Sequence, residues 1–345
     1  MNVSKFNVIL SGLFLMSFLT INASEKDVLL KKLRSGKGGC LKGKNIIITC
    51  KKAPNKDVPS FGLGDGFLYL RVLTEYLETK YKANVSVVPP KPLVKFFNLC
   101  SNIKIANEGD KKENTIIVDC VELLDNIDGL ENFESKKRFL DKTKLWANRE
   151  VNDLVEVFKK LNKIPVIVTR QSAHYKFKSK EEEKTMAYLN ERSISREKLA
   201  KILKKKPEHI EVFNMQFEDQ KELDIENTKK PVTVYPSYNK RAGAFVRDAI
   251  LLKAALKAGG QIVSIDTAAA MLAIGVPEAE DKRKNIIILL GKAHNSRWKK
   301  PFLKKDGSVS WSKNVLFLVQ KKRKDWSAVG KMLNKIWSSL KKKES

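Results

Sequence analysis

The chain has 345 residues, of which 42% are hydrophobic, and it carries a formal net charge of +28. That length suits two domains of ordinary size, and the hydrophobic content excludes disorder throughout. The charge favours anionic partners, such as acidic glycans, nucleic acid or a membrane surface, although a solvated lysine-rich surface explains it more simply. No zinc-finger spacing, RNA-binding aromatic signature or Walker motif occurs, so no specific nucleic-acid partner is expected.

The first residues have the layout of a secretory signal. Lys5 precedes an apolar run over residues 8–21, and the small residues Ala23 and Ser24 follow it. This order predicts a signal peptide over residues 1–23 and an exported protein, periplasmic or secreted. The alternative is a membrane anchor made by the same segment, although the run is short for a helix that spans a bilayer.

The cysteines all lie in the first half of the chain, as Cys40, Cys50, Cys100 and Cys120. Four cysteines allow three pairings, and an oxidising compartment would permit disulfides. Four small buried thiols near strand ends are an equally good interpretation. Because no CxxC pair occurs, no metal site is predicted.

The first run of elements alternates strands and helices. Short β-branched or apolar segments predict strands at 44–50, 83–90 and 114–120. An apolar stripe that begins at Phe67 predicts a helix after Gly66, and a second helix is predicted at 92–100. A charged and mostly helical stretch follows at 131–162.

A second run of the same kind follows from residue 164. It predicts strands at 164–170, 209–216, 232–237, 261–266 and 285–291 and helices at 195–203, 247–259 and 267–275. Such alternation predicts an α/β fold with two Rossmann-like domains that face each other across a cleft. The domains are expected at 40–160 and 161–325. A basic helix, 326–345, is expected to cross back towards the first domain.

Ligands of such folds bind where strands run into loops, and the first such place is "FGLGDGFLYL" at 61–70. Gly62 and Gly64 permit a tight turn, and the positive end of the following helix favours an anion at Asp65. The simplest interpretation is that Asp65 caps this helix. A GxGxxG fingerprint is absent, so no nicotinamide cofactor is predicted.

The second place is "SIDTAAAMLA" at 264–273, where a predicted strand ends at Asp266. Thr267 is placed to cap the next helix, and small residues from Ala268 onward would leave its N–H groups open to a phosphate. The same alanines would also allow close packing of the helix on the sheet.

The third place is "TRQSAHYK" at 169–176, followed by "NERSISREKL" at 190–199. His174 and Arg192 are candidates to contact an anion there, the arginine through paired hydrogen bonds. Basic residues in loops are more often only solvated.

These stretches together resemble a known family, the heptosyltransferase-related glycosyltransferases, and particularly the glycosyltransferase domain that follows tetratricopeptide repeats in some bacterial proteins. The resemblance covers the chain from about Leu41 to Trp337. It is carried by "GLGDGFLYLR" at 62–71, "RQSAH" at 170–174 with "ERSIS" at 191–195, "IDTAAAMLA" at 265–273, and the closing "RW", "LFLVQ" and "DW".

The resemblance implies a GT-B fold and inverting sugar transfer from a nucleotide-diphosphate sugar without a bound metal or other cofactor. The acceptor, a glycan or another hydroxyl compound, would bind the first domain, with Asp65 as the general base. The second domain would hold the donor phosphates through Asp266, Thr267, Ala268, Arg192 and His174.

The chain also departs from the family pattern. Met271 stands where the family has histidine, and Gln171 and Ser172 replace a glycine–asparagine pair. An insertion at 175–190 falls where donor contacts are expected, and an exported protein is separated from cytosolic nucleotide sugars. The alternative hypothesis is therefore an exported, non-catalytic relative that binds a glycan or polyanion.

Overall fold

A computed structural model of the chain describes fourteen stretches of residues, and all structural statements concern these. They are residues 25–36, 41–51, 63–107, 114–130, 133, 135, 139–140, 145–170, 193–215, 228–229, 243–276, 285–291, 315–320 and 325–340. The predicted signal peptide, the predicted strand 232–237, His174 and Arg192 lie outside them. No helix among the described residues has the length and apolar character needed to cross a membrane.

The first half is a parallel sheet in the order β3-β2-β1-β4. Its strands are β1 (Asn45–Thr49), β2 (Asn84–Val88), β3 (Lys104–Ile105) and β4 (Thr115–Asp119). The central strand β1 is almost wholly buried, which fits its run of isoleucines. A continuous helical segment follows it, made of α2 (Leu63–Asp65), the π-helical turn η1 (Gly66–Leu70) and α3 (Arg71–Tyr81).

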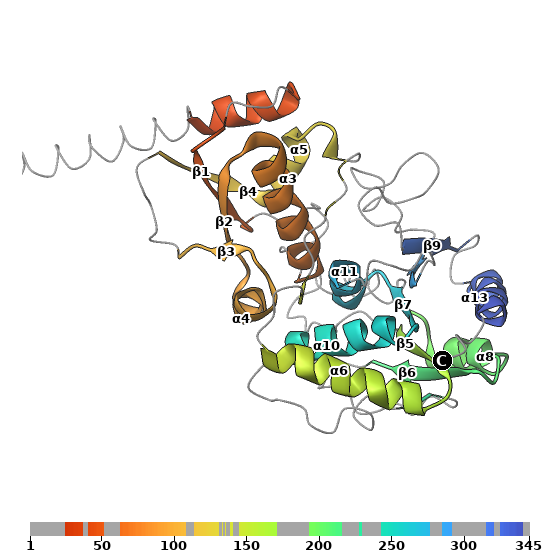
Figure 1. The fold of residues 1–345 in the computed structure, drawn as a ribbon. Coiled ribbons are helices and arrows are strands. Elements are labelled where there is room, and N and C mark those ends of the chain that lie inside the picture. Colours follow the sequence, from red (N-terminus) through yellow and green to blue (C-terminus); the bar gives the residue numbers. More distant parts are fainter. Residues whose placement is uncertain are drawn as a thin grey trace, which may run out of the picture.

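Further helices complete the first half. They are α4 (Lys91–Cys100), α5 (Cys120–Asn126) and a helix at 25–34. Leu29 and Leu33 of that N-terminal helix are buried in the core, and Lys26 pairs with Glu122 of α5 at 2.9 Å. Neither α5 nor the helix at 25–34 was expected from the sequence pattern. Figure 1 shows the N-terminal helix lying outside β1 and α5.

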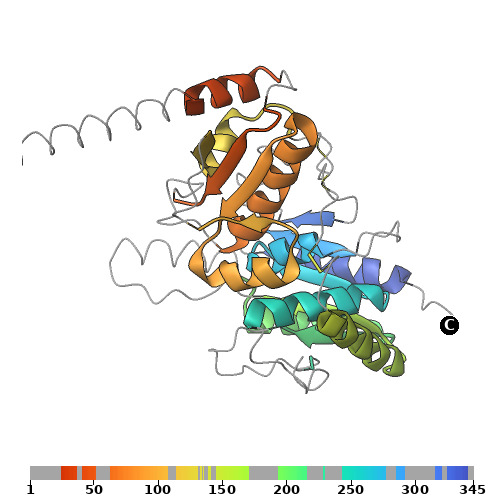
Figure 2. The same cartoon turned by 60° about the vertical axis from the view of Figure 1, so that its left-hand side comes forward.

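The second half is a parallel sheet in the order β6-β5-β7-β8-β9. Its strands are β5 (Ile164–Thr169), β6 (Ile210–Asn214), β7 (Gln261–Ile265), β8 (Ile286–Leu290) and β9 (Val315–Val319). The described helices around it are α6 (Leu145–Lys160), α8 (Arg196–Leu203), α10 (Ala244–Lys257), α11 (Ala268–Gly275) and α13 (Ser327–Ser339). Two parallel sheets with flanking helices confirm the predicted α/β, doubly Rossmann-like fold (Figures 1 and 2).

Two helices pack differently from the sequence-based expectation. The predicted crossing of the C-terminal helix to the first half is wrong, because α13 lies against α8 in the second half. There Trp337 is buried, and its indole donates a hydrogen bond to Gln261 at 3.1 Å. Helix α6 precedes the expected boundary near residue 160, yet it packs along α10 of the second half. Because α6 packs with the second half, the boundary between the two halves lies before Leu145.

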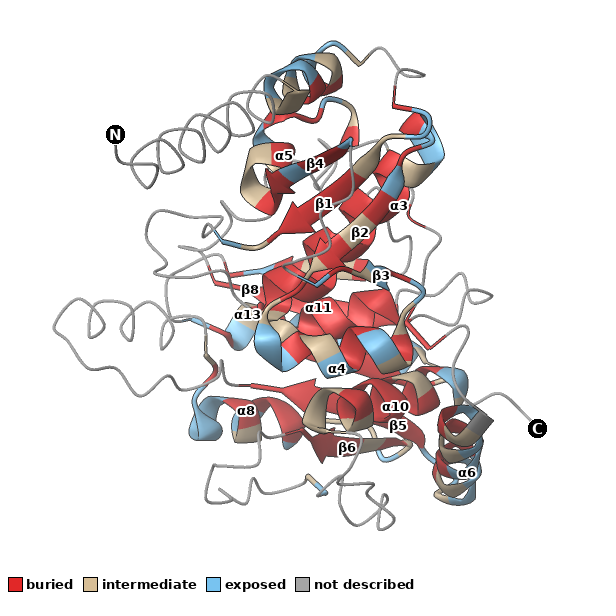
Figure 3. Cartoon of the chain, turned by 90° about the vertical axis from the view of Figure 1, so that its left-hand side faces the viewer, coloured by how far each residue is buried: buried red, intermediate tan, exposed pale blue. Residues whose placement is uncertain are grey.

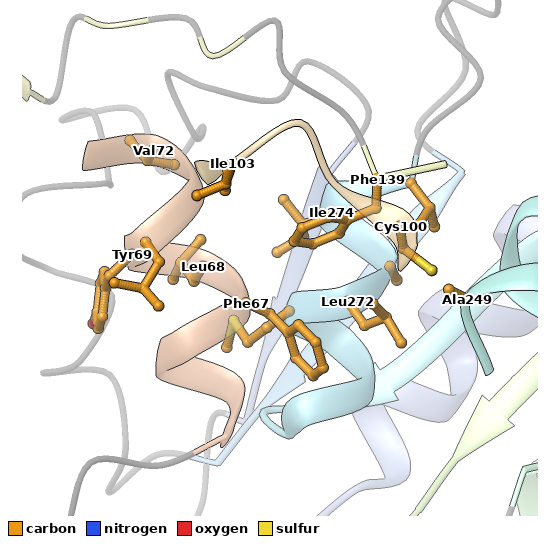
Figure 4. Packing of buried hydrophobic residues seen from close by; sticks show 14 of the residues in the cluster. Phe67, Leu68, Tyr69, Val72, Cys100, Ile103, Phe139, Ala249, Leu272 and Ile274 are labelled. Atoms are coloured by element: carbon orange, nitrogen blue, oxygen red, sulfur yellow. The ribbon is translucent and has the colours of Figure 1, made fainter. Parts of the chain in front are cut away.

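The two halves share one apolar core along a seam formed by η1, α4, α10 and α11. Phe67 of η1 meets Phe96 of α4 and Phe245 of α10 at ring-centroid distances of 4.8 Å and 5.3 Å. Helix α11 is almost wholly buried and contacts both α2 and η1. Figure 3 shows it in the buried colour between the two sheets, and Figure 4 shows Phe67 reaching towards Leu272 of α11.

The end of α11 is also tied to this seam through Phe139. Its backbone N–H donates to the carbonyl of Gly275 at 2.6 Å, and its ring leaves no space beside that glycine. A Cβ at position 275 would lie 2.3 Å from Cδ2 of Phe139.

We predict that Gly275→Ala lowers the free energy of unfolding by about 1–3 kcal/mol, because the added methyl group overpacks the seam. Denaturant unfolding of the purified chain measures this. The cost should shrink in a Phe139→Leu background, where the ring is gone. An equal cost in both backgrounds would contradict the assigned contact.

Candidate functional site

Each sheet has one point at which the chain reverses the direction in which it adds strands. In the first sheet this switch point lies between β1 and β4, and in the second it lies between β5 and β7. In open α/β sheets, the crevice outside the carboxyl ends of such strands is where ligands bind. The residues that follow these four strands therefore define the candidate site.

At the first switch point, Asp119 links the ends of β1 and β4. One of its carboxylate oxygens accepts the backbone N–H of Lys51 at 2.8 Å, and the other accepts that of Val121 at 3.0 Å. Asp119 is therefore the N-cap of α5, and it also binds the backbone that follows β1, the neighbouring strand. Cys50 and Cys120 follow the two strands directly.

Asp65 lies beside this switch point and is only 2% exposed. It does not act as the helix cap, because the helix already begins at Leu63 and Asp65 has right-handed helical backbone angles. Its side chain makes no capping hydrogen bond to the described backbone that follows. Its position in the first helical turn still suits a negative charge.

The charge of Asp65 reaches the thiol of Cys120. Burial raises the pKa of Cys120 well above its ordinary value, a hydrogen bond with the Cys50 thiol raises it further, and the nearby charges of Asp119 and Asp65 add smaller increases. Asp65 and Asp119 are thus buried near the Cys120 thiol, with the half-buried Cys50 beside it.

At the second switch point, Asp266 and Thr267 are buried after β7. The hydroxyl oxygens of Thr267 and Ser264 lie 3.2 Å apart, and Thr267 makes no side-chain bond to the described N–H groups of α11. Across from Ser264 in the strand register, Thr169 ends β5. Its buried hydroxyl has no hydrogen-bond partner in the described part of the chain.

The two switch points touch through Gly64. A Cβ at that position would lie 3.3 Å from Cα of Ala268, 3.4 Å from its N and 3.2 Å from Cγ of Met271. Helix α2 of the first half therefore covers the N-terminus of α11. Where a cleft was expected between Asp65 and Thr267, the structure places packed backbone.

Arg170, directly after β5, is the basic residue of this region. It is 3% exposed, and among the described residues its Nε and Nη2 have no hydrogen-bond partner. Burial lowers the pKa of its guanidinium, the neighbouring charge of Arg196 lowers it further, and Glu197 opposes them. The guanidinium therefore lies near the start of α8 with donors that no described residue accepts from.

The sequence-based candidates divide into two groups. Asp65, Asp266, Thr267 and Ala268 come together at the seam, whereas His174 and Arg192 lie outside the described residues. Sequence reasoning missed Thr169 and Arg170, although both stand at the end of a predicted buried strand. The signal for Arg170 in the sequence was a charged residue at the end of a buried strand.

The described residues contain no group of three or more His, Cys, Asp or Glu side chains placed to hold a metal ion.

No family model and no curated protein matches the chain. Among solved structures, it is similar to the crystal structure of a glycosyl transferase family 9 protein from Veillonella parvula DSM 2008. The identity is 12%, the TM-score is 0.46, and the match covers 88% of this chain and 91% of that one.

We predict that Arg170→Met raises the free energy of unfolding of the ligand-free chain by about 1–3 kcal/mol, the cost of leaving a buried polar group without partners. Thermal or denaturant unfolding measures the change. Arg149→Met, on the exposed face of α6, is the matched control and should change stability little. A loss of stability for Arg170→Met would show that the guanidinium is satisfied within the protein.

Proposed function

We propose that the chain is a glycosyltransferase-like protein whose nucleotide-diphosphate-sugar donor binds at the carboxyl edge of the second sheet. The observation that carries this proposal is Arg170, a buried guanidinium beside a switch point whose Nε and Nη2 have no hydrogen-bond partner among the described residues. A diphosphate group supplies the negative charge and the acceptor oxygens that such a guanidinium binds best. The ordered motifs noted in the sequence support the same assignment.

In this proposal Asp65 acts as the general base. Its carboxylate takes the proton of an acceptor hydroxyl, and the hydroxyl oxygen attacks the anomeric carbon of the donor sugar as the nucleoside diphosphate departs. Attack from the face opposite the leaving group inverts the anomeric centre. Arg170 would stabilise the charge that develops on the departing diphosphate, and Thr169 and Thr267 would supply hydroxyl donors.

The packed seam places a condition on this mechanism. Asp65 is 2% exposed and Gly64 covers Ala268, so both reactants gain access only when α2 shifts relative to α11. Such closing and opening around substrates is common among transferring enzymes and excludes water during the reaction.

A second candidate function rests on Met271. Its side chain lies against Gly64 at the seam, where the resembling family has a histidine. An apolar side chain there removes a phosphate-binding group from the start of α11. The second candidate is therefore a non-catalytic relative that binds a polyanion or glycan.

We predict that uridine, guanosine or adenosine diphosphate raises the melting temperature of the full chain in a concentration-dependent way, since a ligand that binds only the native state stabilises it. Arg170→Gln should weaken that binding by about 1.5–3 kcal/mol, the range for hydrogen bonds to charged groups. Arg149→Gln removes the same charge from the exposed face of α6, so it is the control and should leave binding unchanged.

Asp65→Asn separates the two candidates. For a transferase it should lower the transfer rate roughly 100-fold to 10,000-fold, the usual contribution of a general base, and leave nucleotide affinity nearly unchanged. Product formation from a panel of radiolabelled donors measures the rate.

If the wild type binds no nucleoside diphosphate while Met271→His does, the non-catalytic candidate holds. If neither binds, both the donor site and the transferase proposal fall.

A further inference from the structure

The thiols of Cys50 and Cys120 are held side by side by the backbone of the first sheet. Strands β1 and β4 are neighbours in parallel register, with Thr49 opposite Asp119. Cys50 follows β1 directly, and Cys120 follows β4 directly as the first residue of α5. The Asp119 carboxylate bonds to the N–H groups of Lys51 and Val121, which follow the two cysteines, so it holds both strand ends together.

This arrangement meets the geometric requirement for a disulfide. Neighbouring strands lie about 4.8 Å apart, and disulfide-bonded cysteines have Cα atoms roughly 4.4–6.8 Å apart. The Cys50 thiol is also near enough to that of Cys120 to raise the pKa of Cys120. We propose that Cys50 and Cys120 form a disulfide that joins the carboxyl ends of β1 and β4 beside Asp65. The proposal does not depend on the transferase function.

The two cysteines differ in access, and this sets the order of the reaction. Cys50 is half-buried, whereas Cys120 is fully buried. With a small-molecule disulfide such as glutathione disulfide as oxidant, the Cys50 thiolate attacks one sulfur and releases one glutathione thiolate. Cys120 then loses its proton and attacks the Cys50 sulfur of the mixed disulfide, releasing the second glutathione. Two protein thiols and one glutathione disulfide become one protein disulfide and two glutathione thiols.

The raised pKa of Cys120, to which its burial contributes most, leaves little thiolate near neutral pH and so slows its attack on the mixed disulfide at Cys50. Cys100 is not placed to join Cys50 or Cys120, because it ends α4 and is buried in the shared core. Burial raises its pKa to about 12.

The test uses the full chain after equilibration with glutathione disulfide, alkylation of free thiols and tryptic digestion without reduction. Trypsin releases Cys50 in the peptide 45–51 and Cys120 in the peptide 113–136. We expect a mass for these two peptides joined and short of two hydrogen atoms, and its loss after reduction. At early times, the peptide 45–51 should carry glutathione.

Cysteine variants assign the pair. Cys40→Ser and Cys100→Ser should retain the joined peptides, while Cys50→Ser should leave Cys120 unlinked. The proposal is overturned if the wild-type chain, shown to be folded by circular dichroism, yields only alkylated or glutathionylated cysteines at every oxidant concentration. It is equally overturned if Cys50 or Cys120 is joined to Cys40 or Cys100 instead.

Discussion

The close approach of Gly64 to the start of α11 is the contact on which the rest of the arrangement depends. Because Gly64 has no side chain, helix α2 reaches the backbone of Ala268 and the side chain of Met271. That approach brings the carboxyl ends of two separate sheets together and buries Asp65 and Thr267 between them. It also lets η1 lie along α11, so that Phe67 enters a core built from both halves.

The polar groups behind that contact are costly to bury. On the first sheet, the Asp119 carboxylate is matched by backbone N–H groups. On the second sheet, Arg170 and Thr169 have side-chain atoms without partners among the described residues. Buried polar groups are nearly always satisfied in folded proteins, so an unsatisfied group requires an explanation such as a ligand.

The sequence pattern was sufficient for elements whose own residues determine them. Strands such as β1 and β8 are continuous apolar runs, and both were predicted within a residue or two. The pattern could not show packing partners, because the apolar stripe of α6 or α13 fits either half equally well. It missed the two-residue strand β3 and the short helix α5, which begins without a break after β4. It singled out Asp65 and Thr267 but could not show that Gly64 packs on Ala268, because that contact joins residues far apart in sequence.

The shared core also limits how the halves can move. A hinge that swung them apart would expose Phe67, Phe245 and the apolar length of α11 to water, at a cost that grows with the area uncovered. Sliding of packed helices keeps such surfaces covered, and small residues allow it. Gly64 and the alanines that open α11 present few side-chain obstacles to that sliding. Relative motion at this seam should therefore be a shear rather than a hinged opening.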